Sequence, residues 1–128
     1  MASQSPEDDS HPSEHTIAKI PNILPRERVF PIQVGGELFK LSGASLSSDA
    51  PSYFSQYFRC QLARALESGE DPSTAIRTLN IDRDPLTFRD IALHLQGYHV
   101  CPRDGTHFVR LFADAQFYSR TFTLSLHF

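Results

Sequence analysis

Two adjacent glycines, Gly35 and Gly36, place the strongest constraint on how this chain folds. They separate VFPIQV from ELFKL, two segments in which apolar and polar residues alternate as in half-buried β-strands. A two-residue turn of the primed type requires positive φ, and both glycines can adopt it without steric cost. We therefore expect a β-hairpin. Because Pro31 has no N–H to donate, one side of the first strand is expected to be an edge or to lie outside the main pairing.

The next segment, SGASLSSDAPSYFSQYFRCQLARALESG, predicts a short turn followed by a helix. Ser48 or Asp49 is the expected N-cap, Pro51 lies in the first turn, and Gly69 is the expected end. An aromatic stripe at helical spacing is expected to pack in the core rather than to form an exposed docking surface. The stripe consists of Phe54, Tyr57 and Phe58. Tyr53 and Tyr57 have polar tips, so they are the candidates for a solvated edge where a partner could bind.

The stretch LNIDRDP, residues 79–85, marks the passage from a short strand to a second helix. A carboxylate at the N-cap and a proline at the first helical position are both favoured, which assigns Asp84 and Pro85 to the start of that helix. The helix is expected to end at Gly97. Local chemistry leaves Asp82 and Arg83 without a structural role.

A third helix is expected after Pro102, at the segment THFVRLFADAQFY. Its apolar residues recur at helical spacing, so we expect them to form one core-facing stripe. The stripe consists of Phe108, Leu111, Phe112, Ala115 and Tyr118.

Charge is unevenly distributed along the chain. Residues 1–25 hold four acidic residues and one lysine, whereas residues 26–128 hold eleven acidic and eleven basic residues. A neutral folded part offers no electrostatic footprint for a polyanion, so we expect no nucleic-acid partner.

Two cysteines do not form a disulfide framework, and no segment resembles a secretory signal. No apolar run approaches the ~18 to 20 residues that span a bilayer, so no membrane association is expected. A cytoplasmic location, with the nucleus as the alternative, follows from these features.

Three regions are expected along the chain. Residues 1–27, rich in Ser, Pro and acidic residues, predict a disordered tail and linker, because so few large apolar side chains cannot offset chain entropy. Residues 28–119 predict one folded domain. Residues 120–128 form an extension in which Phe122, Leu124, Leu126 and Phe128 alternate with small or polar residues, a pattern that favours a strand.

Four stretches, in this order, resemble the BTB/POZ domain: VGGELFKLS, LSSDAPSYFSQYF, LNIDRDPLTFRDIALHLQGY and LFADAQFYS. The branch they resemble is the one shared with the tetramerisation domains of voltage-gated potassium channels. The HLQGYHV segment is similar to fungal BTB proteins of the Whi-type stress-response and growth-regulator group. The resemblance implies an α+β fold, in which an N-terminal β-hairpin and a short third strand pack against a cluster of α-helices.

The same resemblance implies a non-enzymatic protein interaction module, without a cofactor, that self-associates into a homo-oligomer or acts as an adaptor. Its implied partners are proteins, such as a phosphatase or a cullin-type ubiquitin-ligase scaffold. In the channel-type branch the Asp-Arg-Asp-Pro segment lies near the contact between subunits. Asp82 and Arg83 are therefore interface candidates, and Arg89 and Asp90 in the following helix are weaker ones. An ordinary solvated cluster of charges is the alternative interpretation.

The residues themselves suggest two other kinds of function, a metal site and an enzyme. His94, His99, Cys101 and His107 surround the turn between the last two helices, and imidazole and thiolate are zinc ligands. Their spacing matches no usual finger or ribbon pattern, so surface histidines and a small buried Cys101 are the alternative. A carboxylate-based enzyme would use Asp82 with Asp84, but capping occupies Asp84, and no nucleophile motif is present.

Overall fold

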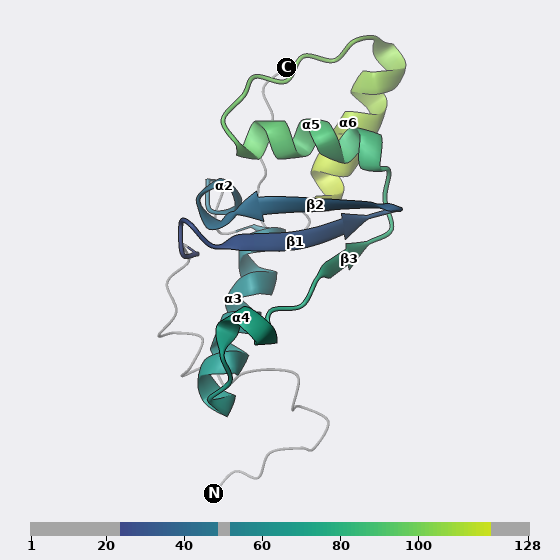
Figure 1. The fold of residues 1–128 in the computed structure, drawn as a ribbon. Helices are drawn as coiled ribbons and strands as arrows, with labels where there is room; N and C mark the ends of the chain where they lie inside the picture. Colours follow the sequence, from purple (N-terminus) through teal and green to yellow (C-terminus); the bar gives the residue numbers. More distant parts are fainter. Residues whose placement is uncertain (1–23, 49–51, 119–128) are drawn as a thin grey trace, which may run out of the picture.

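A computed structural model of the chain describes residues 24–48 and 52–118. The fold is α+β, a small sheet with several helices, as the sequence predicts (Figure 1). In chain order, the elements are β1 Val29–Val34, β2 Glu37–Ser42, α2 Gly43–Leu46, α3 Tyr53–Ser68, α4 Pro72–Ala75, β3 Leu79–Ile81, α5 Pro85–Leu95 and α6 Gly105–Tyr118. The predictions for the tail before residue 24 and for residues 120–128 fall outside the described residues.

The three strands form one sheet in the order β2-β1-β3. β1 and β2 pair antiparallel, with Val34 opposite Glu37, so the predicted hairpin with its two-residue loop is confirmed. β3 pairs with β1 in parallel, from Ile32 opposite Leu79 to Val34 opposite Ile81. β1 is therefore the central strand. Pro31 lies one residue outside the parallel ladder, so its missing N–H removes no bond to β3.

The hairpin turn uses its two glycines differently. Gly35 has φ +58°, whereas Gly36, which could also adopt positive φ, does not. A turn with positive φ only at its first central residue also fits the twist of a hairpin. The Gly35 N–H donates to the Ile81 carbonyl at 2.9 Å. A Cβ at Gly35 would lie 3.0 Å from Pro85 Cδ and 3.1 Å from the Arg83 carbonyl oxygen. The turn thus packs directly against residues 83–85.

Helix α3 begins later than the sequence suggested. Its N-cap is Ser52, which forms a capping box with Ser55, so the expected cap at Ser48 or Asp49 is wrong. Ser48 instead donates from its hydroxyl to the Leu95 carbonyl at 3.1 Å. The predicted end of the helix is confirmed, since Gly69 is the C-cap with φ +77°.

Aromatic rings from α3, α5 and α6 pack together in the core. The Phe54 ring centroid lies 5.8 Å from that of Phe88 and 5.1 Å from that of Tyr118, and Phe30 of β1 lies 4.6 Å from Phe58. Phe54 and Phe58 are fully buried, so the aromatic stripe of α3 belongs to the core, as expected. Figure 1 shows α5 and α6 together above the sheet, whereas α4 and the C-terminal part of α3 lie below it.

The core face of α6 differs from the predicted one. Leu111, Ala115 and Tyr118 are buried as expected, but Phe108 and Phe112 are 41% and 48% exposed. Their rings stack with centroids 6.1 Å apart. Two polar residues, His107 and Asp114, are buried in their place. The helix is rotated because these two side chains have partners on neighbouring segments, which an apolar pattern does not reveal.

Packed structure extends four residues before the predicted domain start at residue 28. Leu24 is buried, and its N–H donates to Ser47 Oγ at 2.8 Å. A Cβ at Gly43 would lie only 1.9 Å from the Pro25 carbonyl oxygen, so the segment before β1 crosses α2 in direct contact. The turn expected after the hairpin forms the short helix α2, and a second short helix, α4, follows α3.

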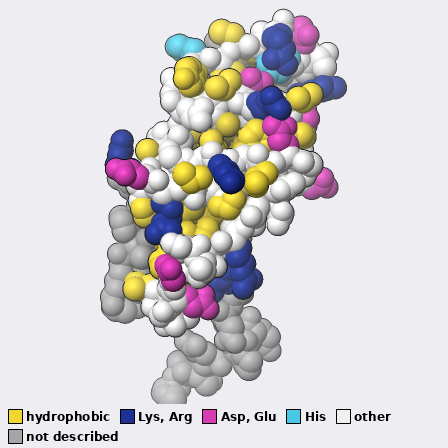
Figure 2. Space-filling view, viewed as in Figure 1, with side chains coloured by type: hydrophobic (Ala, Val, Ile, Leu, Met, Phe, Trp, Pro, Cys, Tyr) yellow, Lys and Arg dark blue, Asp and Glu magenta, His cyan; other side chains and the backbone are white. Residues whose placement is uncertain are grey.

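Surface charge is mixed in sign. Figure 2 shows Lys and Arg side chains interspersed with Asp and Glu on one face rather than gathered into a single patch. In residues 24–48 and 52–118, no helix has the length and apolar character needed to cross a bilayer.

Candidate interaction site

Residues 82–90 comprise the link from β3 to α5 and the first half of α5, and they carry four of the predicted interface residues. Arg83 is bound within the chain. Its Nε and Nη2 donate to Asp114 Oδ1 of α6 at 3.0 and 2.5 Å, and its guanidinium carbon lies 4.4 Å from the centroid of the Phe117 ring. The Arg83 side chain is 32% exposed and that of Asp114 is 8% exposed. The cation is thus fixed in place yet still reaches solvent.

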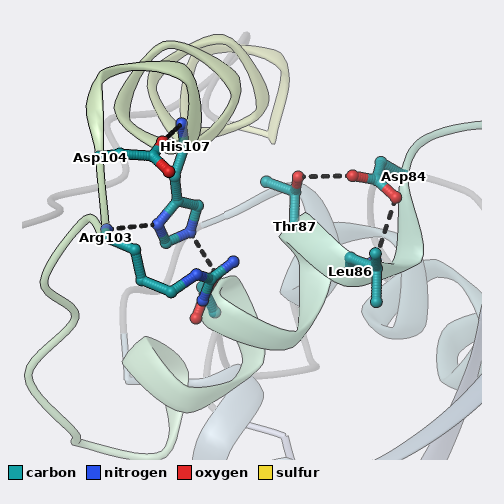
Figure 3. Close-up of polar contacts among 7 residues, drawn as sticks. Asp84, Leu86, Thr87, Arg103, Asp104 and His107 are labelled. Carbon is teal, nitrogen blue, oxygen red and sulfur yellow. Dashed lines mark hydrogen bonds and ion pairs between the residues drawn. The ribbon is translucent and has the colours of Figure 1, made fainter.

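Asp84 caps α5, and Pro85 is the first helical residue, as the sequence predicts. One carboxylate oxygen accepts from the Leu86 N–H at 3.1 Å and the other from the Thr87 hydroxyl at 2.8 Å (Figure 3). The hydrogen bond from Thr87 is the largest cause that lowers the pKa of Asp84 below its usual value. Since the carboxylate is committed to the cap, it is poorly placed to act as a catalytic base.

Asp90 pairs with the buried His107. The Arg103 N–H donates to His107 Nδ1 at 2.8 Å, so this nitrogen carries a lone pair and the ring proton lies on Nε2 (Figure 3). Nε2 can then donate to Asp90 Oδ2 at 2.7 Å. Asp104 Oδ1 accepts from the His107 N–H at 2.8 Å, which orders the first turn of α6. The contact between Asp90 and His107 thereby links α6 to α5.

Arg89 and Asp82 lie at the surface. Arg89 Nη2 forms an ion pair with Glu37 Oε2 of β2 at 2.7 Å; the Arg89 side chain is exposed and that of Glu37 is partly exposed. Asp82 is exposed at the end of β3, and within the described residues no side-chain hydrogen bond or ion pair involves it. We call Asp82, Arg83, Arg89 and Glu37 the polar edge.

Tyr53 and Tyr57 are half-buried at the side of α3. The Tyr53 ring centroid lies 6.2 Å from that of Phe117, the ring that Arg83 covers. Tyr57 packs against Phe58 with ring centroids 5.0 Å apart, and burial raises the pKa of Tyr57. Tyr53 therefore adjoins the polar edge through Phe117. The interface role of both tyrosines remains a prediction.

Two adjoining hollows lie between the start of α5 and the outer side of α6. One has a volume of about 510 Å³ and includes Arg83 and Asp114 in its lining. The other, of about 140 Å³, includes Arg103, Asp104 and His107. Asp84, Leu86, Thr87 and Arg110 line both. We call the two hollows together the α5–α6 groove.

The four residues considered for zinc do not form a ligand set. His107 is occupied by Asp90 and Arg103, and His99 and Cys101 are exposed. The expectation that Cys101 is buried is therefore wrong. Within the part of the chain that the structure describes, no group of three or more His, Cys, Asp or Glu side chains could hold a metal ion. The zinc hypothesis is not favoured.

Sequence reasoning missed the partners that hold this segment in place, Asp114, His107 and Phe117. Asp114 lies three residues after Leu111 and four before Tyr118, so it falls on the buried face of α6. A charged residue in phase with an apolar stripe indicates a buried pair, since an unpaired buried charge is very costly. This pattern is visible in the sequence, but it does not identify which residue pairs with Asp114.

Fold and site together define an α+β domain with a polar edge beside its hairpin turn. No family model matches the chain. It is 39% identical over 98 residues to a BTB/POZ domain-containing protein of Saccharomyces cerevisiae, YLR108C, covering 77% of this chain and 18% of that protein. It is 40% identical over 121 residues to an uncharacterized protein of the same yeast, YDR132C, covering 91% of this chain and 24% of that protein.

The similarity to YLR108C supports a BTB/POZ domain in this chain, and the observed architecture is consistent with the BTB/POZ fold. This chain spans a quarter or less of the length of both yeast proteins. A BTB/POZ domain suggests a protein interaction module.

Proposed function

We propose that this chain is a non-enzymatic BTB/POZ interaction module that self-associates through its polar edge and presents an adaptor surface to other proteins. We place it in the branch shared with potassium-channel tetramerisation domains, near the fungal Whi-type proteins. The contact of Gly35 with the Arg83 carbonyl and with Pro85 supports this placement, because it makes the two motifs of the resemblance one structural unit.

The observation that carries the proposal is the position of Arg83. Asp114 and Phe117 hold its guanidinium in one orientation, while about a third of the side chain stays exposed beside the exposed Asp82. A fixed, solvent-accessible charge loses little conformational entropy when a partner binds. Charges of this kind fix the register and the choice of partner more than they add affinity.

The contacts of Arg83 and Asp82 make Asp82→Arg a better test of the polar edge than Arg83→Glu. Arg83→Glu would place a second carboxylate against the buried Asp114, so lost assembly could reflect a damaged fold. Asp82→Arg avoids this problem, because Asp82 is exposed and no described side chain pairs with it. Glu70→Arg makes the same charge change in the exposed loop between α3 and α4 and is the matched control.

Sedimentation velocity of the two variants and of the unmodified chain tests the proposal. We expect Asp82→Arg to weaken self-association at least about fivefold, the scale of one lost charge contact of about 1 kcal/mol, and Glu70→Arg to leave it unchanged. Equal self-association of all three proteins would contradict a role of the polar edge in assembly.

An adaptor role requires a second protein. A phosphatase or a cullin-type ubiquitin-ligase scaffold is the partner class we infer, in a signalling or stress-response complex. Cytoplasmic or nuclear residence fits such a complex, and the described cysteines, Cys60 and Cys101, are both free thiols. Co-purification with the unmodified chain but not with Asp82→Arg would place the partner at the same edge.

A further inference from the structure

The α5–α6 groove is separate in chemistry from the polar edge, although Arg83 borders both. Three carboxylates line it, and each is committed within the chain: Asp84 caps α5, Asp104 binds the His107 N–H, and Asp114 binds Arg83. Both oxygens of Asp84 accept hydrogen bonds, whereas Asp114 uses only Oδ1 and its Oδ2 is buried without a described partner.

The guanidinium groups of the groove are less committed. Arg83 is paired, but Arg103 and Arg110 are exposed, and within the described residues neither guanidinium forms a hydrogen bond or an ion pair. Each carries five N–H donors in a rigid fork that matches a carboxylate. The groove therefore presents two exposed guanidiniums with donors available to a ligand.

An apolar side chain lies between these donors. Leu86, in the first turn of α5, lines both hollows and is 63% exposed. Ala113 of α6 borders the larger hollow. An exposed leucine beside two available guanidiniums is suited to a ligand that combines an apolar side chain with carboxylates.

We propose that the α5–α6 groove binds a short acidic segment of another protein, in which Asp or Glu residues flank a leucine-like side chain. Its carboxylates pair with Arg103 and Arg110, and its apolar side chain covers Leu86. This inference rests on the proposed interaction function and names the chemistry of the partner. A nucleic acid fits poorly, because two available guanidiniums are few for a polyanion and its backbone would leave Leu86 without an apolar contact.

A labelled synthetic peptide, EDLEDLE, tests the proposal by fluorescence anisotropy with the full chain. Its amide analogue, QNLQNLQ, keeps the leucines and removes the charges. We expect saturable binding of EDLEDLE that weakens at least about threefold between about 50 and 300 mM salt, and binding of QNLQNLQ at least about tenfold weaker.

Two variants locate the binding site. Arg110→Glu reverses one guanidinium, and Leu86→Glu removes the apolar contact while placing an acid in the first turn of a helix, where it is tolerated. Both should reduce affinity at least about tenfold, the scale of one lost charge-assisted contact. Arg77→Glu is the matched control, since Arg77 is exposed between α4 and β3 and lines neither hollow.

Unchanged affinity in Arg110→Glu, or an equal loss in Arg77→Glu, overturns the inference. So does a fall in the molar mass of the chain when EDLEDLE is added, because a second copy would then be the natural occupant. If the peptide does not bind while the chain still self-associates, only the proposed peptide site in the groove is overturned. The polar edge depends instead on the Asp82→Arg result.

Discussion

Arg83 and Asp114 are joined across 31 residues of sequence, by two hydrogen bonds to a single carboxylate oxygen. The bond ties the segment after β3 to the last described helix. It also holds the predicted interface arginine in the orientation in which Phe117 lies beneath it. The same ion pair thus serves the fold and prepares the polar edge.

The two partners of this pair are unequally buried, so we expect their removal to have unequal effects. Arg83→Leu leaves the Asp114 carboxylate buried without a cation and should lower the free energy of unfolding by about 2 to 4 kcal/mol. Asp114→Asn leaves an arginine that water can reach and should lower it by only about 1 kcal/mol. Urea denaturation followed by circular dichroism measures both, and equal losses would contradict the burial of Asp114.

The two glycines of the hairpin provide a matched pair. Gly35→Ala combines positive φ with a Cβ in close contact with Pro85 and Arg83, so we expect it to lower the free energy of unfolding by about 1 to 3 kcal/mol. Gly36→Ala meets no atom within 4 Å and should change stability by less than about 0.5 kcal/mol. Thermal unfolding of both variants tests this, and the reverse order would refute the turn geometry.

The cap of α5 predicts a dependence on pH. Asp84→Ala should lower the free energy of unfolding by about 1 kcal/mol at neutral pH through loss of the N-cap. Because the folded state lowers the pKa of Asp84, this contribution is present in full above its usual pKa of 3.8 and is lost as the pH falls further. The difference between variant and unmodified chain should therefore shrink below about pH 4. A difference that stays constant down to pH 2 would contradict it.

Tyr118 has a buried hydroxyl with no described hydrogen-bond partner. Tyr118→Phe should therefore leave stability unchanged at neutral pH or raise it by up to about 1 kcal/mol. Burial, followed by the nearby Asp114, raises the pKa of Tyr118 well above its usual value.

A raised pKa means that the neutral phenol stabilises the fold fully below about pH 10 and progressively less above it. The unmodified chain should then lose up to about 1.4 kcal/mol per pH unit relative to Tyr118→Phe under alkaline conditions. Parallel alkaline unfolding curves for the two proteins would argue against the burial of this hydroxyl.

Elements with strong local signals were predictable from the sequence. The hairpin depends on two glycines, and the start of α5 depends on Asp84 with Pro85, so each signal lies within a few residues of the structure it specifies. The N-cap of α3 was misplaced because several serines compete for that position, and only the reciprocal bonds of Ser52 and Ser55 distinguish the correct one.

The candidate site was predictable only in part. Asp82 and Arg83 stood out because no local role accounted for them, and the exposed Asp82 fits that reasoning. The partners Asp114 and His107 are 31 and 17 residues from the groups they bind, a separation that no local pattern encodes. Their burial also rotates α6, which exposes Phe108 and Phe112 against the expectation from apolar periodicity.

The most direct test of the central claim is the molar mass of the unmodified chain in solution, by light scattering after size exclusion at low micromolar concentration and at two salt levels. Self-association through the polar edge predicts a multiple of 14.4 kDa that decreases at high salt. A mass of 14.4 kDa under both conditions would contradict self-association and leave docking of a different protein as the function to pursue.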